Sequence, residues 1–176
     1  IRGIVHTAGV IEDGTVAAMT SEQLQRVLEP KMRGSWNLHH ESAADELEFF
    51  ILFSSIAGVM GSPGQSNYAA ANAFMDGLAQ DRVRKGLKAA SIAWGPWADG
   101  GMAAELAAAD QARMQRRGFA PLEAAQGLEF LDEALDGNHA LMVAVNLDIR
   151  RLQKLIERSG AAVPALYRKL IRLSGT

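Results

Sequence analysis

Short apolar runs alternate along the chain with longer segments in which apolar residues recur at helical spacing. The runs predict strands at Gly3–His6, Phe49–Phe53, Ala90–Trp94 and Leu141–Val145. The longer segments predict helices over Ser21–Ala44, Gly64–Lys85 and Pro121–Leu135. Strands that alternate with helices favour a parallel sheet with helices on both faces. We therefore expect an α/β protein with a doubly wound, Rossmann-like parallel sheet.

Local signals refine the helix boundaries. Thr20 with Gln23 forms a capping-box pattern at the start of the first helix. Pro30 is expected to divide that region into two helices, because proline disrupts a helix interior. Lys31 would then open the second of the two. Gly86 has the residue type that commonly ends a helix, and it directly follows the predicted helix Gly64–Lys85.

Composition excludes several classes of protein. The chain has 176 residues, 48% of them hydrophobic, a formal net charge of −2 and no cysteine. This length and apolar content suit one globular domain rather than a disordered chain. Without cysteine there is no disulfide or thiolate chemistry, and we expect no metal site. The absence of a basic excess, of a long apolar run and of a signal-peptide pattern predicts a cytoplasmic domain without nucleic acid or membrane partners.

Four polar residues suggest carbonyl chemistry. Tyr68 and Asn72 are four positions apart, so on a helix they share a face. Ser55 lies just after the predicted apolar strand Phe49–Phe53, and Lys31 lies further upstream. A phenol has an ordinary pKa near 10, which a nearby ammonium lowers. Tyr68 could therefore donate a proton with Lys31 as its electrostatic partner, while Ser55 donates a hydrogen bond to the same carbonyl oxygen.

This set resembles the active site of the short-chain dehydrogenase/reductase superfamily. The family usually has Tyr-x-x-x-Lys, whereas here Asn72 follows the tyrosine and Lys31 lies on an earlier helix. That exchange resembles the ketoreductase domains of modular type I polyketide synthases. The resemblance implies NADPH-dependent reduction of a β-ketoacyl thioester carried on the phosphopantetheine arm of an acyl carrier protein. It also implies that Asn72 holds the lysine or a water in a proton relay.

The same resemblance identifies segments that would contact the cofactor. They are Thr7-Ala8-Gly9 after the first strand and Gly95-Pro96-Trp97 after the third. The phosphate-binding pattern G-x-G-x-x-G does not occur. The chain is thus interpreted as the C-terminal half of a ketoreductase domain, with the N-terminal half and neighbouring synthase domains as partners. A substrate lid is expected over about residues 98–120, with flexible Gly100 and Gly101 and a helix at Met102–Asp110.

A sequence fingerprint bears on the handedness of the product. Ketoreductases of the family are sorted by a Leu-Asp-Asp-like tripeptide, and the matching residues here are Ile11-Glu12-Asp13. Pro63 and Asn67 also match the group that carries this motif, and Met60 replaces the tryptophan of the opposite group. The resemblance implies the B-type group, which forms the D-hydroxyl product, with Asp13, Pro63 and Asn67 orienting the substrate.

The C-terminal part differs in character. We assign residues 1–146 to the catalytic half-domain and residues 147–176 to an amphipathic tail or linker with two short helices separated by Pro164. Apolar residues at helical spacing predict that the tail packs on the domain, namely Leu152, Leu155, Ile156, Leu166, Leu170 and Ile171. Its basic residues either form a solvated face or dock an acidic neighbour such as an acyl carrier protein.

Simpler interpretations remain for each residue. A helical tyrosine can serve packing, a serine can cap a helix and a lysine can lie on a solvated face. The ordered combination of the four favours catalysis. At the level of the whole domain, the alternatives are a ketoreductase-like scaffold that reduces nothing, an inactive half that needs a separately supplied nucleotide-binding half, and a domain that epimerises the α-carbon without reduction.

Overall fold

The computed structural model describes residues 1–98, 114–137 and 139–171. These residues form two compact units, which we describe separately. The first unit comprises Ile1–Trp94 and Ala125–Ala144, and the second comprises Gly95–Ala124 and Val145–Thr176. Within the described residues, no helix is both long enough and apolar enough to cross a membrane.

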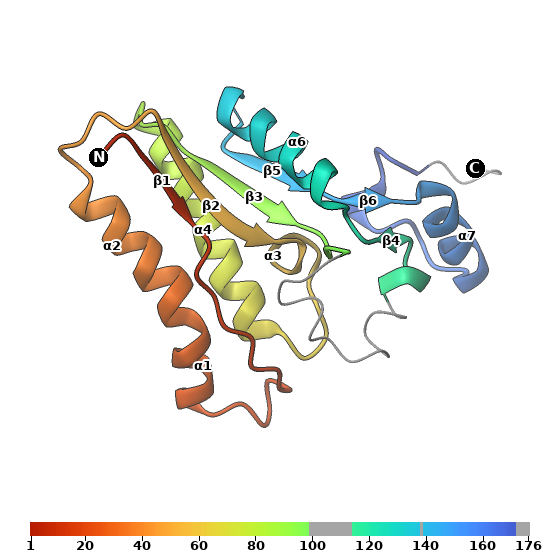
Figure 1. Ribbon diagram of the computed structural model, residues 1–176. Coiled ribbons are helices and arrows are strands. Elements are labelled where there is room, and N and C mark those ends of the chain that lie inside the picture. The colour runs from red at the N-terminus through yellow and green to blue at the C-terminus, as the bar shows by residue number, and fades with distance from the viewer. Residues whose placement is uncertain (99–113, 138, 172–176) are drawn as a thin grey trace. The chain divides into compact units, whose positions relative to one another are not determined.

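The first unit is built on a parallel sheet (Figure 1). Its strands are β1 (Gly3–His6), β2 (Phe49–Ser55), β3 (Ala90–Trp94) and β5 (Leu141–Ala144). The sheet order is β1-β2-β3-β5, and every neighbouring pair is parallel. This confirms the predicted α/β architecture. β2 continues two residues beyond its predicted end, because Ser54 and Ser55 still pair with Ala93 and Trp94 of β3.

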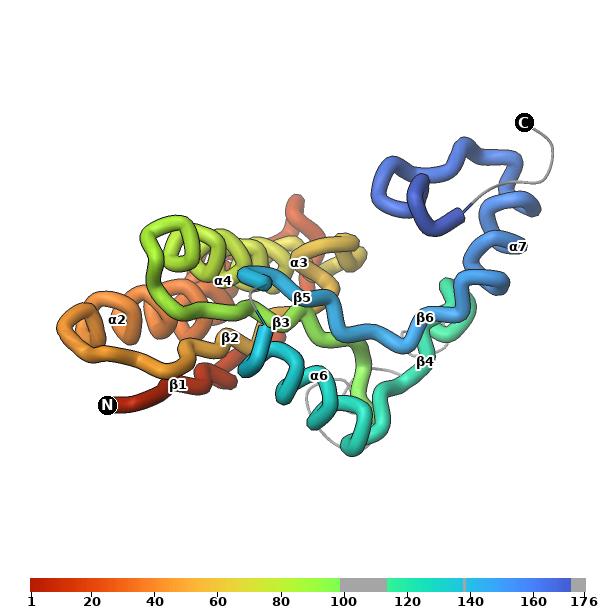
Figure 2. The backbone as a smooth tube through the Cα atoms, turned by 90° about the horizontal axis from the view of Figure 1, so that it is seen from above, coloured from red at the N-terminus to blue at the C-terminus, as the bar shows by residue number. Residues whose placement is uncertain are grey.

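Helices cover both faces of this sheet. They are α1 (Ser21–Leu28), α2 (Gly34–Glu41), α3 (Ile56–Met60), α4 (Ser66–Arg84) and α6 (Ala124–Asp136). Figure 2 shows α4 and α6 on opposite faces. The core between β2 and α4 consists of Phe50, Leu52, Met75, Leu78 and Ala79, all at most 5% exposed. The short helix α3 was not predicted.

The prediction that Pro30 divides the first helix was wrong. A π-helical turn, η1 (Glu29–Arg33), joins α1 directly to α2, so the helix runs without a break from residue 21 to residue 41. Proline has no N–H and its ring clashes with the carbonyl four residues before it. The wider π turn accommodates that ring inside the helix. Lys31 therefore lies within η1 and does not open a second helix.

Two predicted helix ends are confirmed. Thr20 and Gln23 make both hydrogen bonds of the capping box at α1. Beyond α4, Gly86 has a φ of 77°, which glycine adopts at no steric cost. The Gly86 N–H donates to the Val83 carbonyl, and the Leu87 N–H donates to the Arg82 carbonyl. This pair of hydrogen bonds is the Schellman motif.

The second unit contains a small antiparallel pair and the tail. Strands β4 (Phe119–Ala120) and β6 (Asn146–Leu147) pair, so the predicted boundary at residue 146 falls inside β6. Helix α7 (Ile149–Ser159) buries Leu152 and Ile156, as their spacing predicts, but Leu155, predicted with them, is 41% exposed. Between Pro164 and residue 171, where the described part of the chain ends, the helical structure is the 3₁₀ turn η2 (Ala165–Tyr167).

The apolar stripe after Pro164 and the lid are two further predictions that the described residues do not fully support. The apolar stripe predicted after Pro164 was wrong in part, because Leu166 and Leu170 are about half exposed while Ile171 is buried. The reason is that a 3₁₀ turn replaces the expected helix, so the helical spacing does not apply. Gly100, Gly101, the Met102–Asp110 helix and most of the predicted lid lie outside the described residues.

Candidate active site

Tyr68 and Asn72 lie on one buried face of α4, as their spacing predicts. Tyr68 is 7% exposed and Asn72 is fully buried. The Asn72 side-chain Nδ2 donates to the Tyr68 backbone carbonyl at 2.7 Å. Its Oδ1 has no hydrogen-bond partner among residues 1–98, 114–137 and 139–171. A buried acceptor without a partner is costly, so this oxygen has the chemistry to accept a hydrogen bond from a water or another donor in the site.

Ser55 joins these two residues at the carboxyl end of β2. It is the N-cap of α3, and its Oγ accepts from the Ala57 N–H at 3.2 Å. Burial raises the pKa of the Tyr68 phenol, while hydrogen bonding from the side chains of Asn72 and Ser55 offsets part of that rise. The hydroxyl of Tyr68 is thus protonated at neutral pH and lies next to two polar side chains.

Lys31, in the π turn η1, is the fourth residue of this group. Its side chain is almost fully buried, and Nζ lies 5.6 Å from the centroid of the Tyr68 ring. Nζ donates to the Phe53 carbonyl on β2 at 2.8 Å. Burial lowers the pKa of Lys31 to about 8, and Asp76 acts in the opposite direction. Lys31 is therefore an interior ammonium beside a phenol and not a solvated surface lysine.

The loop at Ile11–Gly14 is fixed to the start of α4. The Gln65 side-chain Nε2 donates to both carboxylate oxygens of Asp13, at 3.1 and 3.2 Å. Asn67 Nδ2 donates to the Glu12 carbonyl at 2.9 Å. The N–H of Gly14 donates to the carbonyl of Gly64, directly after Pro63. The three residues predicted to orient the substrate thus lie in two segments that hydrogen bonds join, Asp13 in one and Pro63 with the buried Asn67 in the other.

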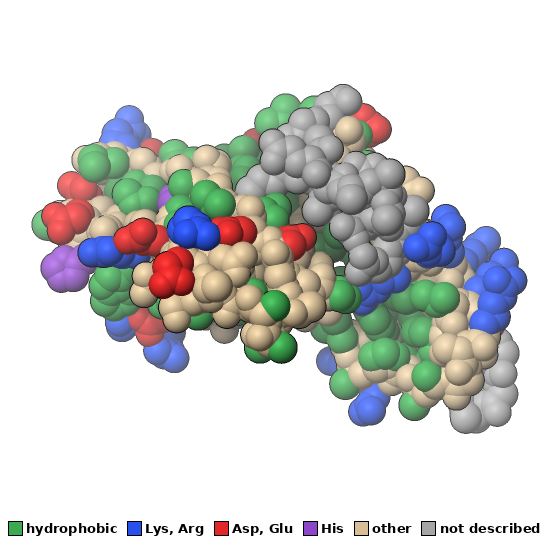
Figure 3. Space-filling model, turned by 90° about the horizontal axis from the view of Figure 1, so that it is seen from below, with side chains coloured by type: hydrophobic (Ala, Val, Ile, Leu, Met, Phe, Trp, Pro, Cys, Tyr) green, Lys and Arg blue, Asp and Glu red, His purple; other side chains and the backbone are tan. Residues whose placement is uncertain are grey.

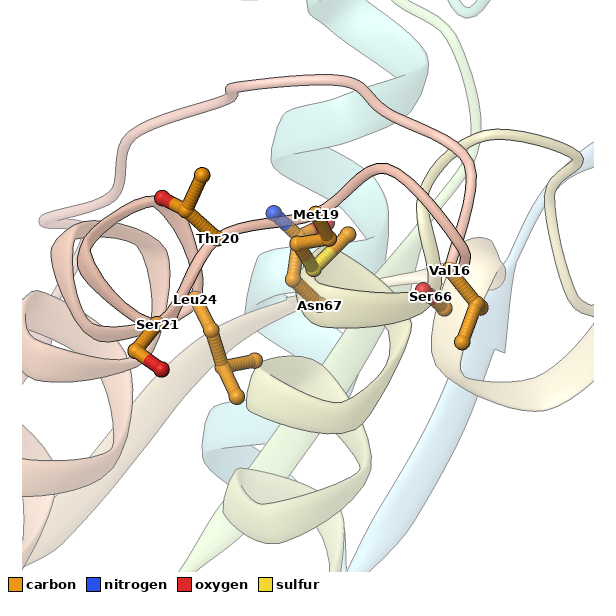
Figure 4. Close-up of a pocket in the computed structure, with 7 residues that line it drawn as sticks. All are labelled: Val16, Met19, Thr20, Ser21, Leu24, Ser66 and Asn67. Carbon is orange, nitrogen blue, oxygen red and sulfur yellow. The ribbon is translucent and has the colours of Figure 1, made fainter.

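An open pocket adjoins these segments (Figure 4). It measures about 310 Å³ and is lined by Val16, Met19, Thr20, Ser21, Leu24, Ser66 and Asn67. Val16, Met19 and Leu24 contribute apolar walls, and the other lining residues add hydroxyl and amide groups. Asn67 is the predicted orienting residue that reaches it.

The predicted cofactor-binding residues fall in both units. Thr7 and Ala8 are exposed and Gly9 is partly exposed, just beyond the carboxyl end of β1. Ligands of open α/β sheets bind beyond the carboxyl ends of the strands, so this accessible, small-residue turn fits a cofactor. Gly95, Pro96 and Trp97 belong to the second unit, where the Pro96 carbonyl accepts from Leu122 N–H at 2.7 Å. Their role toward a cofactor stays a prediction.

Sequence reasoning missed three polar residues of this region. The first is Gln65, whose side chain donates hydrogen bonds to Asp13. The others are Asp76, which interacts with Lys31 through its charge, and Ser54, which interacts with Asp76 by hydrogen bonding. Asp76 follows Tyr68 and Asn72 at successive intervals of four, so a carboxylate on the buried face of the helix was a readable signal. Ser54 and Gln65 carry no comparable signal in the sequence.

Comparison with known proteins identifies the family. The family model described as "KR domain" matches residues 1–99. Polyketide synthase GfsB of Streptomyces halstedii is 46% identical over 98% of this chain, which spans 3% of that protein. The phenolphthiocerol synthesis polyketide synthase type I Pks15/1 of Mycobacterium marinum is 44% identical, again over 98% of this chain and 8% of that protein.

A solved structure extends the likeness to the fold. The structure described as A-type ketoreductases from a modular polyketide synthase matches with a TM-score of 0.86 and 34% identity, over 96% of this chain and 35% of that one. The type in that description belongs to that protein. The chain thus spans a small part of the synthases and about a third of the solved ketoreductase. This chain belongs to the ketoreductase (KR) domain family of polyketide synthases.

Proposed function

We propose that the domain containing this chain reduces a β-ketoacyl thioester, carried on the phosphopantetheine arm of an acyl carrier protein, with NADPH as the cofactor. The observation that carries the proposal is the group formed by the buried Tyr68 and Lys31 with the partly buried Ser55. It joins a protonated phenol, an ammonium 5.6 Å from the phenol ring and a hydroxyl at a strand end. Reduction of a ketone requires these capacities from the protein.

In this mechanism, Tyr68 and Ser55 bind the ketone oxygen through their hydroxyl groups. The hydride that the carbonyl carbon receives would come from NADPH when it is bound. Tyr68 transfers its phenolic proton to the oxygen, and Ser55 stabilises the developing negative charge by donating a hydrogen bond. The ammonium of Lys31 stabilises the phenolate that Tyr68 becomes when it gives up its proton. The free Oδ1 of Asn72 supports a water through which Tyr68 regains its proton.

The proposal is tested with a complete ketoreductase domain that contains this chain. We expect it to consume NADPH with a β-ketoacyl pantetheine thioester and to release the β-hydroxyacyl thioester. A scaffold domain would consume none, and an epimerising domain would exchange the α-hydrogen for deuterium without consuming NADPH. Either result in place of reduction would contradict the proposal.

We further propose the B-type stereochemical course with the D-hydroxyl product. The support is the connection of Asp13 to Gln65 and of Glu12 to Asn67, which fixes the sorting tripeptide beside the start of the Tyr68 helix. A surface fixed in this way can direct the thioester arm to enter from one side. It takes no part in proton transfer.

Replacing Asp13 with alanine should erode the D-to-L ratio of the product while the rate changes by about threefold or less. The cause would be loss of both hydrogen bonds from Gln65 to the carboxylate. Chiral chromatography of the reduced thioester measures the ratio. Gln65→Ala should reproduce the effect from the other partner. A dominant L product from the unmodified domain, or a loss of turnover with selectivity intact in Asp13→Ala, would contradict this division of roles.

The partner surface is proposed to lie on α7. Arg150, Lys154 and Arg158 recur every four residues and are exposed, and Arg151 extends the same face. None of the four has an ion pair within the described residues. Figure 3 shows Lys and Arg side chains gathered on the surface of the second unit. Such a surface favours an acidic partner, which in this setting is the carrier protein.

Reversing Arg150, Lys154 and Arg158 to glutamate should raise KM for the carrier-bound substrate by about three- to tenfold, with kcat unchanged. The effect should shrink as salt rises, because salt screens exposed charges. A pantetheine thioester without the carrier protein is the control substrate, and Lys88→Glu on the first unit is the control variant. An equal effect on both substrates would rule out docking by this face.

A further inference from the structure

Asp76 is a buried carboxylate that the mechanism above does not use. It lies on α4 in line with Tyr68 and Asn72 and is only 6% exposed. The Ser91 hydroxyl on β3 donates to its Oδ1 at 2.6 Å. The Ser54 hydroxyl on β2, which lies 3.4 Å from the Asn72 carbonyl, also helps to lower the pKa of Asp76 by side-chain hydrogen bonding. Burying a carboxylate is costly unless hydrogen bonds and an opposite charge compensate for it.

The opposite charge is Lys31. Its ammonium is buried in the same interior, and its direct hydrogen bond goes to the Phe53 carbonyl, next to Ser54 in β2. Burial raises the pKa of the Asp76 carboxyl, and hydrogen bonds from Ser91 and Ser54 and the charge of Lys31 offset part of that rise. Burial lowers the pKa of Lys31, and the charge of Asp76 opposes that fall, so each group favours the charged form of the other. The other ionisable groups near Lys31 are the Tyr68 phenol and His6 on β1, whose pKa Lys31 helps to lower.

We infer that Asp76 is a positioning residue for the reduction: its carboxylate, held by Ser91 and Ser54, is the buried countercharge that keeps the Lys31 ammonium protonated beneath Tyr68. This inference rests on the proposed function for its effect on rate, but not for the pairing itself. Asp76 does not touch the reacting atoms. It acts through Lys31, whose ammonium would otherwise lose its proton at a lower pH.

Asp76→Asn removes the charge and keeps the shape of the side chain. We expect the pKa of the Lys31 ammonium to fall by about one unit. It can be followed by NMR of ¹³Cε-labelled lysine, assigned with Lys31→Met. Asp81→Asn, at a partly exposed position of the same helix, should leave this pKa unchanged. An unchanged Lys31 pKa in folded Asp76→Asn would overturn the inference.

The rate of reduction separates a positioning role from a structural one. Asp76→Asn should lose rate most at pH 8–9 and recover it as the pH is lowered toward 6, through kcat rather than KM. In the Lys31→Met background the same change should have no further effect on rate. A loss equal at every pH would mean a structural role. A shifted Lys31 pKa with an unaltered rate profile would keep the pairing and contradict the proposed role of Lys31.

The unmodified protein provides a second measurement if Asp76→Asn does not fold. Coupled charges respond to each other's titration. The ¹³Cγ signal of Asp76 should therefore show a step near pH 8, where Lys31 loses its proton. No step at that pH would equally overturn the inference.

Discussion

Tyr68→Phe should lower the rate of reduction by a factor of about 10² to 10⁴, because it removes the proton donor and keeps the ring. The hydroxyl is the part of this buried side chain that meets Ser55 and Asn72, and its loss leaves the packing of α4 in place. NADPH affinity should change little, since the phenol is proposed to contact the ketone. Steady-state kinetics with a β-ketoacyl pantetheine thioester measures the rate, and fluorescence titration measures cofactor binding.

Tyr167 is the matched control, because the chain has only 2 tyrosines. It is as buried as Tyr68 but lies in the η2 turn of the second unit. Tyr167→Phe should therefore keep a near-normal rate. Near-normal turnover in Tyr68→Phe would refute the assignment of Tyr68 as the proton donor, and equal losses in both variants would indicate a general effect on stability.

The four strands of the parallel sheet and the main helices around it could be predicted from the sequence, because period and composition are local properties, whereas β4 and β6 were not predicted. β1 and β3 have the predicted bounds, and the capping box at Thr20 and the glycine end of α4 follow from backbone chemistry. The juxtaposition of Tyr68 and Asn72 follows from helical spacing alone. The prediction that Ser55 and Lys31 lie near Tyr68 rests instead on the order of motifs that this chain shares with the family it resembles.

What could not be predicted depends on contacts between distant segments. Proline signals a break in isolation, yet the helix around Pro30 continues because a π turn accommodates the ring. That turn places Lys31 in the interior, with a carbonyl of β2 as its acceptor. The bond between Gln65 and Asp13 joins residues 52 positions apart, and no local pattern encodes it.

Lys31→Met should lower the rate of reduction by about ten- to a hundredfold. With an effective dielectric constant of about 20, a unit charge about 6 Å away contributes on the order of 3 kcal/mol, which corresponds to about 10² in rate. The direct observation is the buried Nζ at 5.6 Å from the Tyr68 ring centroid. Methionine keeps a long apolar stem in the same space and removes the charge.

The pH dependence gives this variant its sharpest readout. The pKa of Lys31 is about 8, so in the unmodified domain the ammonium is lost, and the rate should fall, as the pH rises through that value. Below that pH, Lys31→Met should reduce the substrate more slowly than the unmodified domain does, and its rate should not fall as the pH rises through about 8. The Tyr68 phenol should ionise at a higher pH in this variant, because the ammonium no longer favours the phenolate. Lys88→Met, at an exposed lysine, should keep the original profile. If Lys31→Met kept the rate and the profile of the unmodified domain, the buried ammonium would serve the fold alone, through its hydrogen bond to Phe53.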